Sequence, residues 1–211
     1  MRILVELLRP LVWLAARAYF GVRFEGVHHI PLQGPLIIAP NHVTYADPPL
    51  VSIPVPRPIY YMAWRRLFDV PVLGWLIRLA RAFPVDVDMA DRRATRQAVR
   101  LLQARAAVMI FPEGGRSVDG RLQPFKPGAF RLASSLGVPV LPVTIVGGHE
   151  TWPPHWLLPR PGRITIVYHP PIVPSPGADL KTASQELSRR ARAAVASRLP
   201  PHQRGVDAGA G

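Results

Sequence analysis

Short apolar runs recur along this chain, and their length is that of strands buried in the middle of a sheet. The run Leu36–Ala39 (LIIA) lies between Gly34-Pro35 and Pro40-Asn41, and Ala107–Phe111 (AVMIF) is a second run of this kind. Runs without polar interruption are typical of strands covered on both faces, as in parallel sheets. The expected strands are Leu36–Ala39, Ile59–Met62, Phe83–Val87, Ala107–Phe111, Val138–Val146 and Arg163–Tyr168.

Segments with helical signals lie between these runs. Asp47 precedes Pro48-Pro49 and is expected to cap the start of a helix, while Gly137 closes a later one. Strands that alternate with helices predict an α/β fold, a single layered domain whose mixed, mostly parallel central sheet is flanked by helices. The longer expected helices are Pro71–Ala80, Met89–Ala104 with Asp88 as its N-cap, Pro127–Leu136 and Lys181–Leu199.

The first twenty residues predict an amphipathic helix. Arg2, Glu6, Arg9 and Arg17 fall on one helical stripe, and nearly all the other positions are apolar. The longest uncharged run, Pro10–Ala16, is far shorter than the about 20 residues that a membrane-spanning helix needs. Charges within the apolar region also argue against a signal peptide. We expect a helix that lies in a membrane interface, and packing on the domain core is the alternative.

The composition narrows the functional classes. The 211 residues include 24 arginines and two lysines against 13 acidic residues, which gives a formal net charge of +13, and there is no cysteine. The lack of cysteine excludes disulfide scaffolds, cysteine nucleophiles and thiolate metal sites. A hydrophobic share of 48% excludes a disordered basic tail, so the charge implies an anionic partner such as nucleic acid, an anionic membrane or a phosphorylated substrate. The expected boundaries are 1–22 for the interface helix, 23–199 for the folded domain and 200–211 for a flexible tail.

One candidate site lies in the loop that follows Leu36–Ala39 and reads Asn-His-Val-Thr-Tyr-Ala-Asp from residue 41 to residue 47. A turn that ends at a helix start can bring His42 and Asp47 within hydrogen-bonding distance. An aspartate that accepts from one imidazole nitrogen fixes the tautomer and leaves the other nitrogen as a general base. His42 and Asp47 are therefore candidate catalytic residues, with a structural histidine beside a helix cap as the alternative.

A second candidate site follows Ala107–Phe111 and reads Phe-Pro-Glu-Gly-Gly-Arg-Ser from residue 111 to residue 117. Two glycines and an arginine at a strand end bring backbone N–H groups and a guanidinium together, which suits an anion such as phosphate. The loop lacks the P-loop pattern. A tight turn with a local ion pair is the alternative. The candidate substrate-binding residues are Glu113, Gly114, Gly115, Arg116 and Lys126.

Taken together, and in this order, the two loops resemble a known family. Asn-His-x-x-x-x-Asp followed by Phe-Pro-Glu-Gly-x-Arg-Ser is similar to the motif pair of the glycerolipid acyltransferases, typified by 1-acyl-sn-glycerol-3-phosphate acyltransferase. The resemblance extends from about Phe24 to Val173, and Phe125–Gly128 and the proline-containing run Val138–Val143 also match. The ordered pair of motifs is far more specific than either motif alone.

The resemblance implies a mechanism and a setting. His42 would take the proton of an acceptor hydroxyl while Asp47 orients it, and the hydroxyl would attack an acyl thioester directly. Acyl-CoA or acyl-carrier protein would be the donor and a lysophospholipid the acceptor, with Arg116 at its phosphate and Glu113 bracing the loop. No metal or other cofactor is implied. The enzyme would be a peripheral protein on the cytoplasmic face of an anionic membrane.

Three positions depart from the family pattern. Gly115 stands where threonine is usual, and Val87 stands where the intermediate motif usually ends in arginine. Arg65, in Trp64–Leu67, is the candidate substitute for a basic residue that is common in that region. Because the intermediate motif helps to hold the acceptor's phosphate in the family, an O-acyltransferase for a different lipid or a secondary-metabolite alcohol is the alternative function.

Other classes of protein fit less well. The arginine-rich segment 92–105 has no interleaved aromatic residues, and the chain has no nucleic-acid-binding motif. It also lacks the G-x-S-x-G pattern of a serine hydrolase. We therefore expect no nucleic-acid partner. We also expect no metal site, since the spacing of His28, His29, His149 and His155 matches no ligand signature.

Overall fold

The computed structural model describes residues 2–86 and 91–205. Within them, a seven-stranded sheet has the order β1-β7-β6-β2-β5-β3-β4. All neighbouring strands are parallel except β6 and β7, so the sheet is mixed and mostly parallel, as predicted. The strands are β1 (Arg23–Glu25), β2 (Leu36–Pro40), β3 (Ile59–Trp64), β4 (Ala82–Val85), β5 (Ala107–Met109), β6 (Val140–Val146) and β7 (Thr165–Tyr168).

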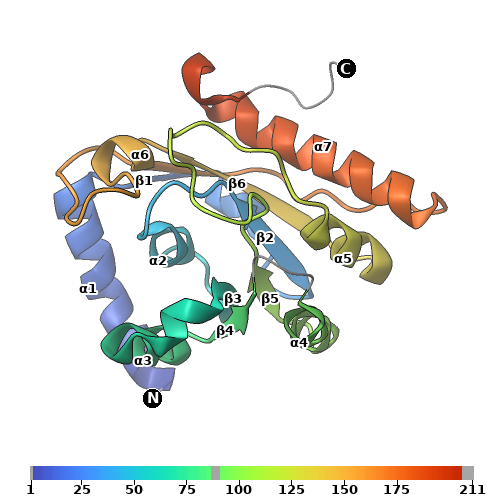
Figure 1. The fold of residues 1–211 in the computed structure, drawn as a ribbon, viewed down its shortest axis with the longest axis horizontal. Helices are drawn as coiled ribbons and strands as arrows, with labels where there is room; N and C mark the ends of the chain where they lie inside the picture. The colour runs from blue at the N-terminus through green and yellow to red at the C-terminus, as the bar shows by residue number, and fades with distance from the viewer. Residues whose placement is uncertain (1, 87–90, 206–211) are drawn as a thin grey trace.

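Helices cover both faces of the sheet. Figure 1 shows α5 and α7 along one face, while α1 and α2 lie on the other. Three short 3-10 turns complete the described elements. The helices are α1 (Arg2–Phe20), α2 (Asp47–Ser52), α3 (Pro71–Leu79), α4 (Arg92–Gln103), α5 (Gly128–Leu136), α6 (Gly148–Thr151) and α7 (Leu180–Arg198), and the 3-10 turns are η1 (Val27–His29), η2 (Arg65–Asp69) and η3 (Pro201–Gln203).

The continuous apolar run of β2 is explained by burial on both faces. Leu36 and Ile38 belong to the core on the α1 and α2 side, whereas Ile37 and Ala39 belong to the core on the α4 and α5 side. Successive side chains of a strand point to opposite faces, so every position of this central strand must be apolar. This explains why the run predicted a central strand.

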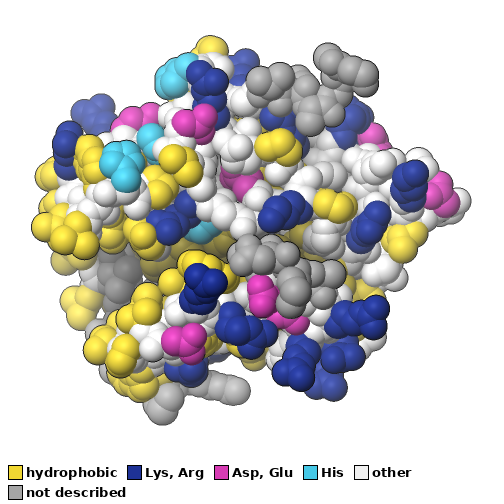
Figure 2. All heavy atoms as spheres, in the orientation of Figure 1, with side chains coloured by type: hydrophobic (Ala, Val, Ile, Leu, Met, Phe, Trp, Pro, Cys, Tyr) yellow, Lys and Arg dark blue, Asp and Glu magenta, His cyan; other side chains and the backbone are white. Residues whose placement is uncertain are grey.

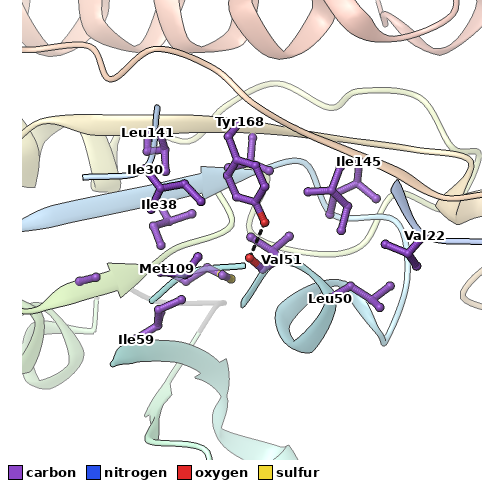
Figure 3. Packing of buried hydrophobic residues seen from close by; sticks show 14 of the residues in the cluster. Val22, Ile30, Ile38, Leu50, Val51, Ile59, Met109, Leu141, Ile145 and Tyr168 are labelled. Carbon is purple, nitrogen blue, oxygen red and sulfur yellow. Dashed lines mark hydrogen bonds between the residues drawn. The ribbon is translucent and has the colours of Figure 1, made fainter. Parts of the chain in front are cut away.

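A buried tyrosine connects the sheet to the helix that carries part of the candidate site. Tyr168 of β7 donates a hydrogen bond of 2.6 Å from its phenol to the carbonyl oxygen of Val51 in α2 (Figure 3). Both residues are fully buried in the same core cluster. This contact holds α2, which begins at Asp47, against the sheet.

Two predicted helix starts differ from the structure. Asp47 is not the N-cap of α2: the cap is Ala46, and Asp47 is the first helical residue, because its carboxylate bonds the preceding loop instead. Asp88 lies outside the described residues. Helix α4 begins at Arg92, and its N-cap is Asp91, whose side chain accepts from the backbone N–H groups of Arg93 and Ala94.

Two segments near the ends of the chain are more ordered than the sequence indicated. Strand β1 was not predicted, since three residues with two charges carry no strand pattern, yet it pairs in parallel with β7. The flexible tail was expected from residue 200, but Pro201–Gln203 form a 3-10 turn, and the carbonyl of Gln203 accepts from the N–H of Leu122. Residues 206–211 lie outside the described part.

Helix α1 contacts the core near its C-terminal end. Ala16 is buried in the core cluster, and Phe20 packs against it. Leu11 and Leu14 are largely exposed, at 62% and 58%. Among the described residues, no helix is long and apolar enough to cross a membrane.

Candidate active site

The loop after β2 places a histidine and an aspartate in direct contact. His42 Nδ1 lies 2.8 Å from Asp47 Oδ2. The Asp47 side chain is fully buried, whereas that of His42 is 17% exposed. A carboxylate only accepts hydrogen bonds, so Nδ1 carries the proton and Nε2 is left with its lone pair. The imidazole is thus held in the tautomer that a general base needs.

Asp47 is held by several donors besides His42. Its Oδ2 also accepts from the backbone N–H groups of Val43 at 2.7 Å and Thr44 at 2.8 Å. Its Oδ1 accepts from the hydroxyl of Thr44 at 2.7 Å. These four bonds satisfy the buried carboxylate and fix its position relative to the histidine.

Neighbouring groups fix the histidine on its other sides. The ring of Phe111 stacks on that of His42, with centroids 3.9 Å apart and planes 24° apart. The side chain of Asn41 exchanges two hydrogen bonds with the backbone of Ile145, which ties the end of β2 to β6. The imidazole therefore stacks on a residue that follows β5, and the end of β2 just before it is tied to β6.

The loop after β5 is bonded directly to the histidine loop through Glu113. Its Oε1 accepts from the backbone N–H of His42 at 2.7 Å, and its Oε2 accepts from the N–H of Gln123 at 2.8 Å. The N–H of Ser117 donates to the carbonyl of His42 at 2.8 Å. Burial raises the pKa of Glu113 to about 8, although the two N–H donors oppose this shift. Glu113 is therefore a brace between the two loops.

Arg116 is held flat against an aromatic ring and has an unsatisfied nitrogen. Its guanidinium carbon lies 3.5 Å from the ring centroid of Tyr45, which in turn lies 5.5 Å from the ring of Trp152. Its Nη1 atom is buried and has no hydrogen-bond partner in the part of the chain that the structure describes. Buried polar atoms are nearly always paired, so this nitrogen is a donor available to a ligand.

A second cation lies beside the glycines of this loop. Gly114 has a φ of +74°, and a Cβ placed there would lie 2.6 Å from the Nζ of Lys126. A side chain at this position would therefore strain the backbone and displace the lysine. The N–H of Lys126 donates to the carbonyl of Pro112 at 2.7 Å, which fixes the lysine against the loop. Gly114 thus leaves room for the cation.

A cleft of about 1,590 Å³ connects these groups. His42, Tyr45, Gly115, Arg116 and Lys126 all line it. It continues between α2, β3 and α3, where its walls are largely apolar. The apolar lining there includes Pro49, Ile53, Tyr61, Leu73, Leu76 and Ile77. The cleft therefore combines a candidate base, an anion-binding corner and space for an apolar chain.

Two positions of the intermediate region do not supply the expected cation. Arg65 does not line the cleft, although Trp64 and Leu67 on either side of it do. Its guanidinium pairs with Asp91 at 3.2 Å, because the 3-10 turn η2 directs it towards the start of α4. Val87 lies outside the described residues. The structure thus brings the other predicted site residues together around the cleft and leaves Arg65 apart.

Sequence reasoning did not identify two aromatic residues of the site. Tyr45 and Phe111 lie within the two motif segments, but their partners Arg116 and His42 come from the opposite loop. Only the aromatic character of these two positions could have been noticed in advance. As for metals, the described residues contain no group of three or more histidine and acidic side chains placed to hold an ion.

The sequence is similar to those of known proteins. Residues 21–146 match the model of the acyltransferase family. The chain is 34% identical to a 1-acyl-sn-glycerol-3-phosphate acyltransferase of Chlamydomonas reinhardtii over 90% of this chain and 57% of the relative. It is 30% identical to the enzyme of that name from Pseudomonas aeruginosa over 90% of this chain and 74% of the relative.

A solved structure shows the same fold. It is that of the 1-acyl-sn-glycerophosphate acyltransferase PlsC from Thermotoga maritima, with a TM-score of 0.65 and 28% identity over 82% of this chain and 71% of that chain. The chain spans about half the length of several plant relatives, for example 48% of a Brassica napus acyltransferase.

Proposed function

The chain belongs to the acyltransferase family, and on that premise we propose that it transfers a fatty acyl group from a thioester to the hydroxyl of 1-acyl-glycerol-3-phosphate, giving phosphatidate. The observation that carries this proposal is the His42–Asp47 hydrogen bond beside a cleft that also holds an arginine nitrogen with no hydrogen-bond partner among the described residues. The base, the anion-binding corner and the apolar space are the three parts that this reaction needs.

In the proposed reaction His42 acts first as a general base and then as a general acid. Its Nε2 takes the proton of the acceptor hydroxyl as the oxygen attacks the carbonyl carbon of the thioester. A carbon–oxygen bond forms, the carbon–sulfur bond breaks, and the departing thiolate takes the proton back from the imidazole. Asp47 keeps the ring oriented and stabilises its charged form, so neither an acyl-enzyme nor a cofactor is needed.

The acceptor's phosphate is assigned to Arg116, with Lys126 and the glycine backbone beside it. The Nη1 of Arg116, which has no partner within residues 2–86 and 91–205, supports this role, because guanidinium groups pair well with phosphate oxygens. Arg116→Ala is expected to raise the KM for lysophosphatidate by about 30-fold and to leave the KM for the thioester nearly unchanged. Arg121→Ala removes an exposed arginine of the neighbouring segment and is the matched control. An unchanged acceptor KM in Arg116→Ala would contradict the assignment.

The donor is proposed to be acyl-CoA or acyl-carrier protein, with its acyl chain in the apolar part of the cleft. The walls between α2, β3 and α3 present aliphatic and aromatic side chains to this space, and their burial against a chain would favour binding. His42 lines the same cleft, so the thioester carbon can reach its imidazole.

We also propose that the protein works as a peripheral protein at the surface of an anionic membrane, on its cytoplasmic face. Helix α3 lines the cleft with Leu73 and Leu76, while Val72 and Trp75 are exposed at 71% and 57%. Hydrophobic side chains gather over this region in Figure 2. A helix that is apolar on nearly every side fits an apolar environment such as a bilayer interface.

Vesicle flotation tests this membrane surface. Val72→Ser/Trp75→Ser should weaken binding to anionic vesicles by about tenfold. Val118→Ser/Val173→Ser removes two valines that are also strongly exposed, at 75% and 62%, and serves as the control. Equal binding by the two double variants would contradict a role for α3.

Identification of the product tests the central proposal. Purified protein is given acyl-CoA together with lysophosphatidate, with lysolipids that lack a phosphate monoester, or with other lipid and secondary-metabolite alcohols, and the products are identified by mass spectrometry. We expect phosphatidate. The alternative is an acceptor of another class, and it is favoured by the engagement of Arg65 with Asp91, which removes one expected cation from the cleft. Acylation of such an acceptor in place of lysophosphatidate would establish the alternative.

A further inference from the structure

Two arginines of α4 line the same cleft as the histidine. Arg92 and Arg96 of α4 are part of its wall, and they lie one turn apart, hence on the same face of the helix. Both are exposed. Among the described residues neither forms an ion pair with a carboxylate. Figure 2 shows lysine and arginine side chains gathered where Figure 1 places α4.

Basic side chains outnumber acidic ones along the cleft. Asp86 and Asp91 are the acidic residues of its described lining. Asp91 is engaged, since it accepts from the N–H groups of Asp86, Arg93 and Ala94 and pairs with Arg65. The cleft therefore presents a positive potential to a ligand. The basic lining residues are Arg57, Arg81, Arg92, Arg96, Arg116 and Lys126.

The sheet order separates α4 from the acceptor's phosphate. His42 follows β2, Arg116 follows the adjacent β5, and α4 follows β4, which lies two strands beyond β5. Neighbouring strands lie about 4.8 Å apart, so the start of α4 is roughly 14 Å along the sheet edge from the end of β2. In lysophosphatidate the hydroxyl and the phosphate occupy adjacent glycerol carbons. The acceptor's phosphate must therefore lie near His42, where Arg116 is available.

We propose that Arg92 and Arg96 bind the phosphate groups of the acyl donor, an acyl-coenzyme A. This inference rests on the proposed acyl transfer. In such a donor the thioester is at one end of the long pantetheine arm and the phosphates are at the other. A thioester at His42 thus places its phosphates farther along the cleft, towards α4. Arginine is suited to this role because its planar fork of donors matches phosphate oxygens.

The same helix supplies a matched control. Arg93 and Arg100 are exposed residues of α4 that do not line the cleft. Arg92→Gln/Arg96→Gln and Arg93→Gln/Arg100→Gln remove the same charge from the same element. For each, the KM is measured for lysophosphatidate, for acyl-coenzyme A and for an acyl-N-acetylcysteamine thioester, which has no phosphate. The ratio of the two thioester KM values should rise at least about tenfold in the Arg92/Arg96 variant and stay near the wild-type value in the control.

Three results would overturn the assignment. They are an unchanged KM ratio in the Arg92/Arg96 variant, an equal rise in both double variants, and a rise confined to the KM for lysophosphatidate. The second result would mean that only the net charge of α4 matters. The third would place the acceptor's phosphate, not the donor's, at α4.

A binding measurement separates this inference from the proposed function. Coenzyme A alone should raise the Tm of the wild type and of the Arg93/Arg100 variant, but not that of the Arg92/Arg96 variant. The Tm measurement needs no turnover, so it still tests coenzyme A binding at Arg92 and Arg96 if lysophosphatidate proves not to be the acceptor. An equal Tm increase in all three proteins would contradict the site, and unshifted melting of the ligand-free variants shows that they are folded.

Discussion

The loops after β2 and β5 both follow a buried parallel strand and both hold a buried carboxylate, yet the two carboxylates are held differently. Asp47 takes all four of its hydrogen bonds from residues 42 to 44 of its own loop. Glu113 takes one from His42, 71 residues away in the sequence, and one from Gln123, ten residues away. One carboxylate is saturated by local donors, and the other connects separate segments.

This difference indicates a catalytic role for Asp47 and a structural role for Glu113. The saturated carboxylate of Asp47 faces an imidazole and can stabilise its charged form during proton transfer. The carboxyl of Glu113 has fewer donors, and burial raises its pKa to about 8, so it is suited to bridging loops rather than to balancing a charge. The hydrogen-bond donors around each carboxyl group thus determine its role in the site.

The largest effect that tests this comparison is expected at Asp47. Asp47→Asn should lower kcat by about 10³-fold, because a neutral amide cannot stabilise the charged form of His42 during proton transfer. The N–H groups of Val43 and Thr44 would then donate to a neutral oxygen, and this loss of charge-assisted hydrogen bonds should lower the free energy of unfolding by about 2 kcal/mol. Steady-state kinetics and urea denaturation measure the two effects.

Asp119→Asn is the control for this change, since Asp119 accepts hydrogen bonds within its own loop but does not contact His42. Its kcat should stay close to that of the wild type. Turnover by Asp47→Asn within tenfold of the wild type would remove the distinction between the two carboxylates.

The distinction between local and distant hydrogen-bond partners explains which contacts of the site could be predicted from the sequence. The His42–Asp47 pair is formed within seven residues, so its partners could be seen from the spacing. The bond between Glu113 and His42 could not, because it depends on β2 and β5 becoming neighbours. Arg65 shows the reverse error: its position in the sequence suggested a substrate contact, but the η2 turn directs it to Asp91.

Glu113 is expected to show its role in stability rather than in turnover. Its pKa rises from an ordinary 4.5 to about 8 in the fold, so the folded state holds a proton that the unfolded state releases in this window. The free energy of unfolding of the wild type, relative to that of Glu113→Gln, should therefore fall as the pH rises from about 4.5 to 8. The slope is at most about 1.4 kcal/mol per pH unit.

Denaturant unfolding of both proteins across this pH range measures the difference, and other titrating groups cancel because the two proteins share them. A difference that is constant with pH, or that grows as the pH rises, would show that Glu113 is ionised in the fold and would make it resemble Asp47.

A smaller effect is expected where the two loops meet at Tyr45 and Arg116. Tyr45→Ala should raise the KM for lysophosphatidate by about fivefold with little change in kcat, because the ring no longer holds the guanidinium in place. Tyr45→Phe keeps the stacking and should restore the wild-type KM. In an Arg116→Ala background, Tyr45→Ala should have no further effect, and additive effects would show that Tyr45 acts independently of the arginine.

The fold was more predictable than these contacts. The central strands were predicted because burial on both faces makes them continuously apolar, as in β2. Strand β1 was missed because its three residues are extended only through pairing with β7. The start of α2 was misplaced because the side chain of Asp47 serves the loop before it rather than the helix. Strand β1 thus depends on a tertiary neighbour, whereas the start of α2 depends on local hydrogen bonds that the apolar pattern does not reveal.

The central claim, that His42 is the base of an acyl transfer to lysophosphatidate, is tested most directly by phosphatidate formation from acyl-CoA in the wild type and in His42→Ala. We predict that the wild type forms phosphatidate and that the variant, with an unchanged Tm, forms it about 10³-fold more slowly. A folded His42→Ala protein that forms phosphatidate within tenfold of the wild-type rate would contradict the account.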